Sequence, residues 1–179
     1  MAPALLLARL TRKEDEIEMA APLDALTLLR KDHELVKDLM NKMDKEEDTD
    51  QLTSMFEQLV DELGIHERIE EEIFYPALQK LPNAKEDVLE AYEEHHLVDE
   101  IVKQMDVETD DDKWKAKFTV MKENVEHHIK DEEEKLFPKA EKLLGSDKLG
   151  ALGVKMADLK EAEQEALAEE LEEEETTSG

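Results

Sequence analysis

The sequence predicts an all-α protein built as an antiparallel, up-down-up-down four-helix bundle. The 179 residues include only 5 Gly and 5 Pro, and aromatic residues make up 4%. Leu, Glu, Lys, Ala and Met abound, and these are strong helix formers. Hydrophobic residues recur alternately every three and four positions in four segments, the spacing of one helix face. The length suits one domain with a substantial core better than two.

The first two predicted helices cover residues 26–43 and 52–73. The apolar stripe of the first helix contains His33, and that of the second contains His66 and Glu70. Spacing of four residues places His66 and Glu70 one turn apart on one helix face. Polar groups therefore stand at positions where a bundle normally has hydrophobic side chains.

The last two predicted helices cover residues 88–105 and 118–136 and have the same design. The stripe of the third helix contains His95, and that of the fourth contains His128 and Glu132. Each half of the chain thus contributes a single histidine followed by a His-x-x-x-Glu pair. Two such halves facing each other would bring four imidazoles and two carboxylates to the middle of the bundle.

Short polar segments are expected to connect these helices. Residues 45–50 and 107–112 are acidic loops that offer Asp50 and Asp112 as N-caps for the helices that follow. Residues 79–85 join the two halves. Connections this short favour antiparallel neighbours.

The ends of the chain differ in composition from the bundle, which is predicted to span residues 23–144. We expect residues 1–22 to form a flexible or loosely packed leader, and residues 145–179 an acidic tail that is partly helical or disordered. Residues 161–175 contain nine Glu and no basic residue, which favours a solvated segment, with a protein partner as the alternative. Pro138, like Pro76 in the first half, is expected to kink or end its helix.

An internal repeat connects the four helices. Residues 33–76 align with residues 95–138 without a gap, at an offset of 62 positions. Imidazoles and carboxylates suit borderline metals such as Fe, Zn and Cu. The alternative is a bundle whose polar core residues satisfy one another, but burying six such groups without a metal is costly unless every one is hydrogen-bonded. The repeat therefore predicts a two-metal site.

Charge and composition exclude several classes of function. A formal net charge of −27 argues against nucleic-acid binding, which needs a basic surface. The absence of Cys leaves only nitrogen and oxygen ligands for a metal. The longest all-apolar run, residues 4–8, is far too short for a membrane span, and the charges around it suit neither a secretory signal nor a transit peptide. We expect a cytoplasmic protein that does not engage a membrane.

Four segments carry a resemblance to a known family. D-H-E-L-V (32–36), H-E-R-I-E-E-E-I-F-Y-P (66–76), E-H-H-L-V-D-E (94–100) and H-H-I-K-D-E-E-E-K-L-F-P (127–138) resemble the hemerythrin-like (HHE cation-binding) domain. The resemblance covers about residues 23–144 and implies a non-haem di-iron centre in a four-helix bundle.

The resemblance also implies a set of ligands. His33 and His66 would bind one iron, and His95 and His128 the other. Two carboxylates would bridge the two Fe ions together with an oxo or hydroxo group; these are Glu70 and Glu132.

The sequence departs from the oxygen-carrying members of that family. They have a further histidine four positions before the third-helix histidine, where this chain has Ala91. Glu67 is a candidate substitute, because it follows His66 directly and its repeat partner is Ile129. The arrangement resembles the His-Glu-x-x-Glu motif in the hemerythrin-like domain of an iron-sensing ubiquitin-ligase subunit. The alternative for Glu67 is an exposed helix glutamate.

Six neighbouring residues are not assigned as ligands. A step of one residue turns a side chain about 100° away from the apolar stripe. We therefore expect two histidines to flank the site and two glutamates to point outward, while two tyrosines could offer a phenol near it. These residues are His96, His127, Glu71, Glu133, Tyr75 and Tyr92.

Three functions are compatible with this set of residues. The leading hypothesis is a di-iron protein that binds O₂, or senses iron or oxygen, at one open coordination position. A glutamate ligand favours ferric iron, which makes reversible O₂ carriage less favourable than in relatives with five histidines. The alternatives are an enzyme that acts on peroxide or nitric oxide at the same centre, and a structural or storage bundle with Zn or Mn.

Overall fold

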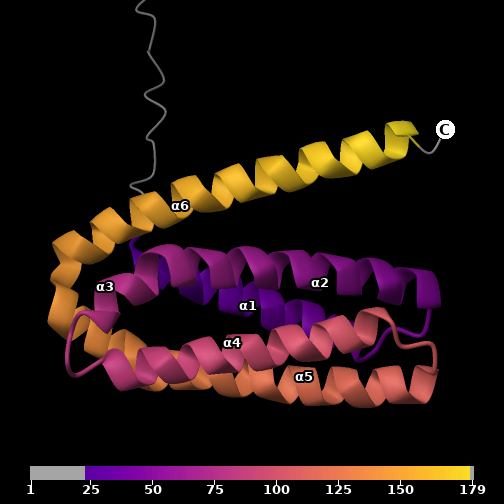
Figure 1. The fold of residues 1–179 in the computed structure, drawn as a ribbon, viewed down its shortest axis with the longest axis horizontal. Helices are drawn as coiled ribbons and strands as arrows, with labels where there is room; N and C mark the ends of the chain where they lie inside the picture. The colour runs from indigo at the N-terminus through magenta and orange to yellow at the C-terminus, as the bar shows by residue number, and fades with distance from the viewer. Residues whose placement is uncertain (1–22, 178–179) are drawn as a thin grey trace, which may run out of the picture.

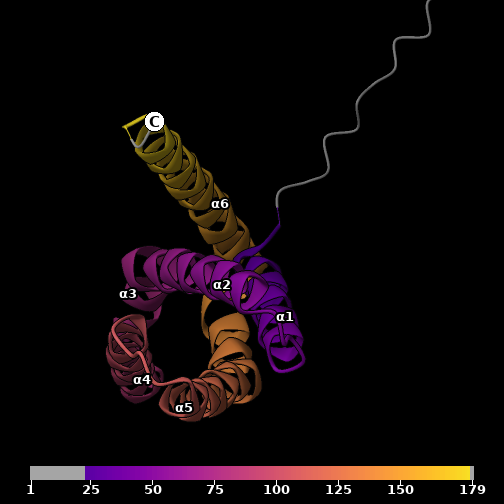
Figure 2. The same cartoon turned by 90° about the vertical axis from the view of Figure 1, so that its right-hand side faces the viewer.

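The computed structural model describes residues 23–177, which form helices and contain no strand (Figure 1). Four long helices run antiparallel and form a ring when viewed end-on (Figure 2). The predicted all-α four-helix bundle is confirmed. The four helices are α1 (Ala25–Met43), α2 (Thr49–Ile69), α4 (Lys85–Asp106) and α5 (Asp111–Asp131).

Aspartates cap the helices at positions slightly different from those expected. The side chains of Asp48 and Asp110 accept hydrogen bonds from the backbone N–H groups three residues further on, at 3.0 and 3.1 Å. The predicted N-caps Asp50 and Asp112 lie instead in the first turns of α2 and α5. An acidic residue is favourable there as well, because it faces the positive end of the helix dipole.

The second helix of each half ends in a five-residue π-helical segment. These segments are η1 (Glu70–Phe74) and η2 (Glu132–Leu136). In each, the N–H of the next residue bonds to the carbonyl of the segment's first residue, five positions back. Single π turns occur often at functional sites, because they change the direction of side chains without ending the helix. Both π segments here begin at a repeated glutamate.

Neither proline ends its helix. Pro76 and Pro138 are the second residues of α3 (Tyr75–Gln79) and α6 (Phe137–Thr177), which continue directly from the π segments. Proline in an α-helix removes a donor and clashes with the carbonyl four residues back. The wider π turn moves those carbonyls out of the α-helical register, and the proline ring is accommodated.

The C-terminal residues form a helix that covers one side of the bundle. At Gly145 (φ 73°, ψ 166°) the chain leaves helical geometry, and the following part of α6 crosses the side formed by α1 and α2 (Figures 1 and 2). Leu149 and Met156 are buried in this contact. The segment expected to be an acidic tail, residues 145–179, is therefore helical as far as Thr177.

A close backbone contact holds this helix to the bundle. A Cβ atom built on Gly153 would lie 2.1 Å from the carbonyl oxygen of Leu23, a distance that no side chain tolerates. Glycine is required here because only its absent side chain permits such an approach. The predicted leader, residues 1–22, lies outside the described residues.

A layer of polar residues divides the buried interior into two apolar clusters. One cluster contains Leu29 and Phe137, and the other contains Met40 and Met121. His33 lies along α1 between them and is 1% exposed. Within residues 23–177, no helix combines the length and apolar character that a membrane span requires.

Candidate metal centre

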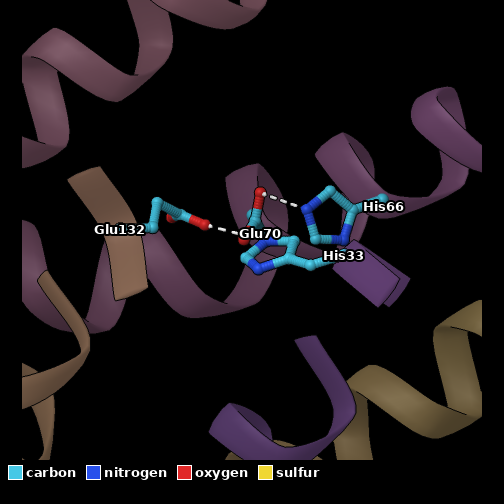
Figure 3. Close-up of side chains that lie close together, drawn as sticks. All are labelled: His33, His66, Glu70 and Glu132. Atoms are coloured by element: carbon cyan, nitrogen blue, oxygen red, sulfur yellow. Dashed lines mark ion pairs between the residues drawn. The ribbon is translucent and has the colours of Figure 1, made fainter. Parts of the chain in front are cut away.

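Six side chains meet in the polar layer between the two apolar clusters. They come from both halves of the chain, and none is more than 5% exposed. Figure 3 shows four of them facing one another. The six residues are His33, His66, Glu70, His95, His128 and Glu132.

Their ligand atoms form two overlapping groups, each within 4.8 Å. The first consists of His33, His66, Glu70 and Glu132, and the second of Glu70, His95 and His128. The structure thus gathers the histidines of each half into a separate group, and Glu70 belongs to both.

Each of the two carboxylates faces histidines of both halves. Glu70 Oε2 lies 3.3 Å from His66 Nε2 and 3.4 Å from His95 Nε2. Glu132 Oε2 lies 3.3 Å from His33 Nε2 and 3.7 Å from His128 Nε2. A carboxylate that bridges two metal ions must lie between their other ligands, and both glutamates have this position.

Several buried atoms in the centre have no hydrogen-bond partner. An unsatisfied buried polar group costs about 1–3 kcal/mol, and more when it is charged. A cation in the centre would satisfy the inward-facing nitrogens and the free carboxylate oxygens together. The atoms that face the centre without a partner are His33 Nε2, His66 Nε2, Glu70 Oε1 and Glu132 Oε2.

The pKa values in the centre show the electrostatic cost of the same arrangement. Burial and the charge of Glu132 raise the pKa of Glu70 well above its usual value. Burial lowers the pKa of His66 to about 4, which keeps its imidazole neutral and able to bind a metal. Burial opposes the protonation of His95, but Glu70 and Glu71 outweigh it and raise the pKa of His95 well above its usual value. Protonation of Glu70 and His95 is therefore favoured when no cation is bound.

A second set of carboxylates faces the outer nitrogens of the four histidines. An ionised carboxylate only accepts, so His33, His95 and His128 donate outward through Nδ1–H. His66 Nδ1 faces Asp32 at a distance too long for a hydrogen bond. A neutral imidazole that donates from Nδ1 directs its Nε2 lone pair at the centre. The contacts are His33 Nδ1 to Glu133 (2.8 Å), His95 Nδ1 to Glu71 (3.0 Å), His128 Nδ1 to Glu94 (2.9 Å) and His66 Nδ1 to Asp32 (3.6 Å).

The expectation that Glu71 and Glu133 point outward was wrong. Each glutamate lies off the apolar stripe of its own helix, but its side chain reaches a neighbouring helix. Glu71 contacts the outer nitrogen of His95, and Glu133 contacts the outer nitrogen of His33. The signal was present in the repeat, because Glu71 and Glu133 are 62 positions apart, and so are Asp32 and Glu94. The duplication therefore includes the carboxylates that orient the histidines.

Tyr75 brings a hydroxyl group into the centre. It is fully buried, and its hydroxyl donates to Glu132 Oε1 at 2.9 Å. The hydroxyl oxygen of Tyr75 also lies 3.2 Å from Glu70 Oε2 and 3.3 Å from His95 Nε2. Burial and the two carboxylates raise the pKa of Tyr75 well above its usual value. The sequence suggested that Tyr75 or Tyr92 could offer a phenol near the site, and the structure places the hydroxyl of Tyr75 there.

Glu67 lies at the edge of the centre and is not part of either ligand group. It lines a cavity of about 20 Å³ together with the four inward histidines and apolar residues that include Val36 and Ile129. A space of this size holds one water-sized molecule. Burial raises the pKa of Glu67 to about 7, although His95 opposes the shift. The structure places Glu67 within the wall of an apolar cavity.

The flanking histidines lie on the outside of the bundle. His96 is exposed, and the side chain of His127 is 64% exposed. His127 contacts Glu94 at 3.4 Å and forms a surface group with Glu94 and Asp131. Neither histidine reaches the two buried groups.

The fold and the site define a helical bundle whose buried histidines and glutamates could hold cations. The family model for the hemerythrin HHE cation binding domain matches residues 24–140. The chain therefore belongs to the hemerythrin HHE cation-binding domain family, as the motifs indicated.

A solved structure has the same fold. It is that of a hemerythrin HHE cation binding domain-containing protein from Mycobacterium kansasii. It is 25% identical, covers 84% of this chain and 93% of its own, and superposes with a TM-score of 0.74. No curated protein matches the sequence significantly.

Proposed function

We propose that the protein holds two iron ions at which it either binds O₂ or a related small ligand, or senses iron or oxygen. The observation that supports the proposal is the set of six buried ligands, in which both glutamates lie between the two halves. His33 and His66 hold one ion, and His95 and His128 hold the other. Two iron ions held by these residues would supply a redox-active pair, and the cavity beside the histidines would admit one small ligand.

The cavity beside the four histidines supports the binding of a small ligand. The cavity of about 20 Å³ borders all four histidines and is otherwise lined mainly by apolar side chains. Only a molecule as small as O₂, nitric oxide or a peroxide fits a space of that size. Glu67 is the candidate seventh ligand, because its carboxylate lies on the wall of this cavity. The proposal includes a cytoplasmic location.

Metal counting tests the ligand set. We expect about two iron ions per chain after anaerobic loading with Fe(II), and about one in His128→Ala. His96→Ala is the matched control, because it removes an exposed histidine next to His95 in the same half and should leave two ions. Unchanged metal content in His128→Ala would refute the ligand assignment. Two zinc ions and no colour after growth with abundant iron would refute the choice of iron.

Admission of O₂ to the reduced protein separates the functions. A charge-transfer band that disappears when O₂ is removed supports reversible binding, and permanent oxidation supports sensing. An enzyme acting on peroxide is the second candidate, because the Tyr75 hydroxyl lies within 3.3 Å of three of the proposed ligands. Release of O₂ from added peroxide, lost in Tyr75→Phe, would favour this second candidate.

A further inference from the structure

The four carboxylates that face the outer histidine nitrogens are not equally covered. The side chains of Glu133, Glu71 and Glu94 are 28%, 40% and 23% exposed. The side chain of Asp32 is only 10% exposed, although its repeat partner is Glu94. Asp32 is therefore the most covered of the four carboxylates, and its equivalent in the second half is more open to solvent.

The cover over Asp32 is the C-terminal helix α6, which adds a positive charge. Lys160 Nζ donates to Asp32 Oδ1 at 2.6 Å and lies 3.8 Å from Glu62. The side chain of Lys160 is 17% exposed. Among the described residues, none of the other three carboxylates is contacted by a lysine of α6. Glu133 is paired instead with Lys37 and Arg30 of α1, at 3.6 and 3.7 Å. Among the described residues, Glu71 and Glu94 have only histidine ion-pair partners, so Lys160 has no counterpart at the carboxylates that face His95 and His128.

Asp32 in turn faces His66. Asp32 Oδ2 lies 3.6 Å from His66 Nδ1, and neither atom has a hydrogen-bond partner. A shift of about 0.6 Å would bring the two atoms to hydrogen-bonding distance. A continuous series of polar contacts thus runs from α6 through Asp32 to a histidine of the first ligand group.

The helix does not depend on Lys160 for its position. Gly153 packs directly on the backbone of Leu23, and Leu149 and Met156 are buried. Arg68 also bonds to Glu163 of α6 at 2.7 Å, at an exposed site. Removal of the Lys160 charge should therefore leave α6 packed on the bundle, and its effect on the centre can be measured separately.

We propose that Lys160 is a positioning residue of the metal centre, which holds the Asp32 carboxylate so that it orients the His66 imidazole with Nε2 toward the centre. The inference rests on the proposed function in so far as His66 is a metal ligand. Partners of this kind commonly change metal affinity 10- to 100-fold. Because the second half has no such lysine, α6 stabilises the ion bound by His33 and His66 and not the other ion.

Metal release tests this inference directly. We expect a chelator to remove about half of the iron at least 10-fold faster from Lys160→Met than from the unchanged protein, with the other half released at the original rate. Lys160→Arg should restore the slow release. Glu163→Gln is the matched control, because it breaks another ion pair between α6 and the bundle, with Arg68 of α2, without touching Asp32. Equal acceleration in Glu163→Gln would show that Lys160 only helps to dock the helix, and would overturn the inference.

A measurement on the metal-free protein distinguishes failure of the inference from failure of the proposed function. Long-range ¹H–¹⁵N spectra report which ring nitrogen of His66 carries the proton. We expect the Nδ1–H form in the unchanged protein and in Glu163→Gln, and a mixture of both forms in Lys160→Met. An unchanged His66 spectrum in Lys160→Met overturns the inference even if two irons bind. A wild-type protein that binds no iron refutes the proposed function, whatever the spectrum of His66 shows.

Discussion

Replacement of Tyr75 by phenylalanine tests how the centre is balanced with and without metal. The change removes a single oxygen atom and keeps the ring, which packs edge-to-face on Tyr92 with centroids 5.2 Å apart. That oxygen is fully buried between two carboxylates, at 2.9 Å from Glu132 and 3.2 Å from Glu70. The variant therefore removes the hydroxyl that lies between the two buried glutamates.

The expected magnitude follows from these contacts. A hydrogen bond to a charged group contributes about 1.5–3 kcal/mol, and its loss leaves a buried acceptor without a partner. In the metal-free protein we expect Tyr75→Phe to lower the free energy of unfolding by about 2–3 kcal/mol. When metal ions balance the two carboxylates, the hydroxyl matters less, and the loss should fall to about 1 kcal/mol. Metal ions should then stabilise the variant more than they stabilise the unchanged protein.

Urea unfolding of both proteins, with and without bound metal, measures the four free energies. Tyr92→Phe is the control, because that hydroxyl is only partly buried and bonds at 3.3 Å to the backbone oxygen of Glu71. It should cost less than about 1 kcal/mol in both states. A loss of equal size with and without metal in Tyr75→Phe would refute the view that this hydroxyl compensates the buried carboxylates.

Three further predictions concern packing and pH. Gly153→Ala should lower the free energy of unfolding by about 1–3 kcal/mol and speed amide hydrogen exchange in α6, because its Cβ would meet the Leu23 carbonyl oxygen. Unchanged exchange in α6 would contradict that contact. Met40→Ala should lower the free energy of unfolding by about 2–5 kcal/mol in urea, since the side chain is fully buried, and a loss below about 1 kcal/mol would mean that the site is less well packed. In the metal-free protein, Glu67→Gln should be neutral at low pH and stabilising above pH 7. Burial raises the pKa of the Glu67 carboxyl from 4.5 to about 7, so the free energy of unfolding of the unchanged protein falls by at most about 3 kcal/mol as pH rises between those values. A difference in urea midpoints that does not depend on pH would contradict the burial of Glu67.

The six central residues could be predicted from the sequence because two local signals agree on them. Helix periodicity assigned each to an inward face, and the repeat paired each with an equivalent residue 62 positions away. The outer carboxylates were missed because only one of these signals includes them. Glu71 repeats as Glu133, but neither lies on the apolar stripe, so its role depends on which helix packs beside it.

The packing of the C-terminal helix could not be predicted. The expectation for residues 145–179 was an acidic tail, partly helical or disordered, and for residues 161–175 a solvated segment; the last described turns are indeed mostly exposed. Contact with the bundle involves spaced residues that include Leu149, Gly153, Met156 and Lys160. Their spacing could not be recognised as a docking face before the surface on which they pack was known.

The sequence by itself determined the helices, their inward faces, the duplicated ligands and the family. These properties follow from local spacing and from the repeat, which do not require knowledge of how the helices pack. Only the tertiary structure decided which carboxylate serves which histidine, that Tyr75 enters the centre, and that α6 covers one half of it. Those contacts join residues far apart in the chain, such as His95 with Glu71 and Asp32 with Lys160. They exist because packing of the apolar faces brings polar groups of different helices together, and no local pattern encodes that pairing.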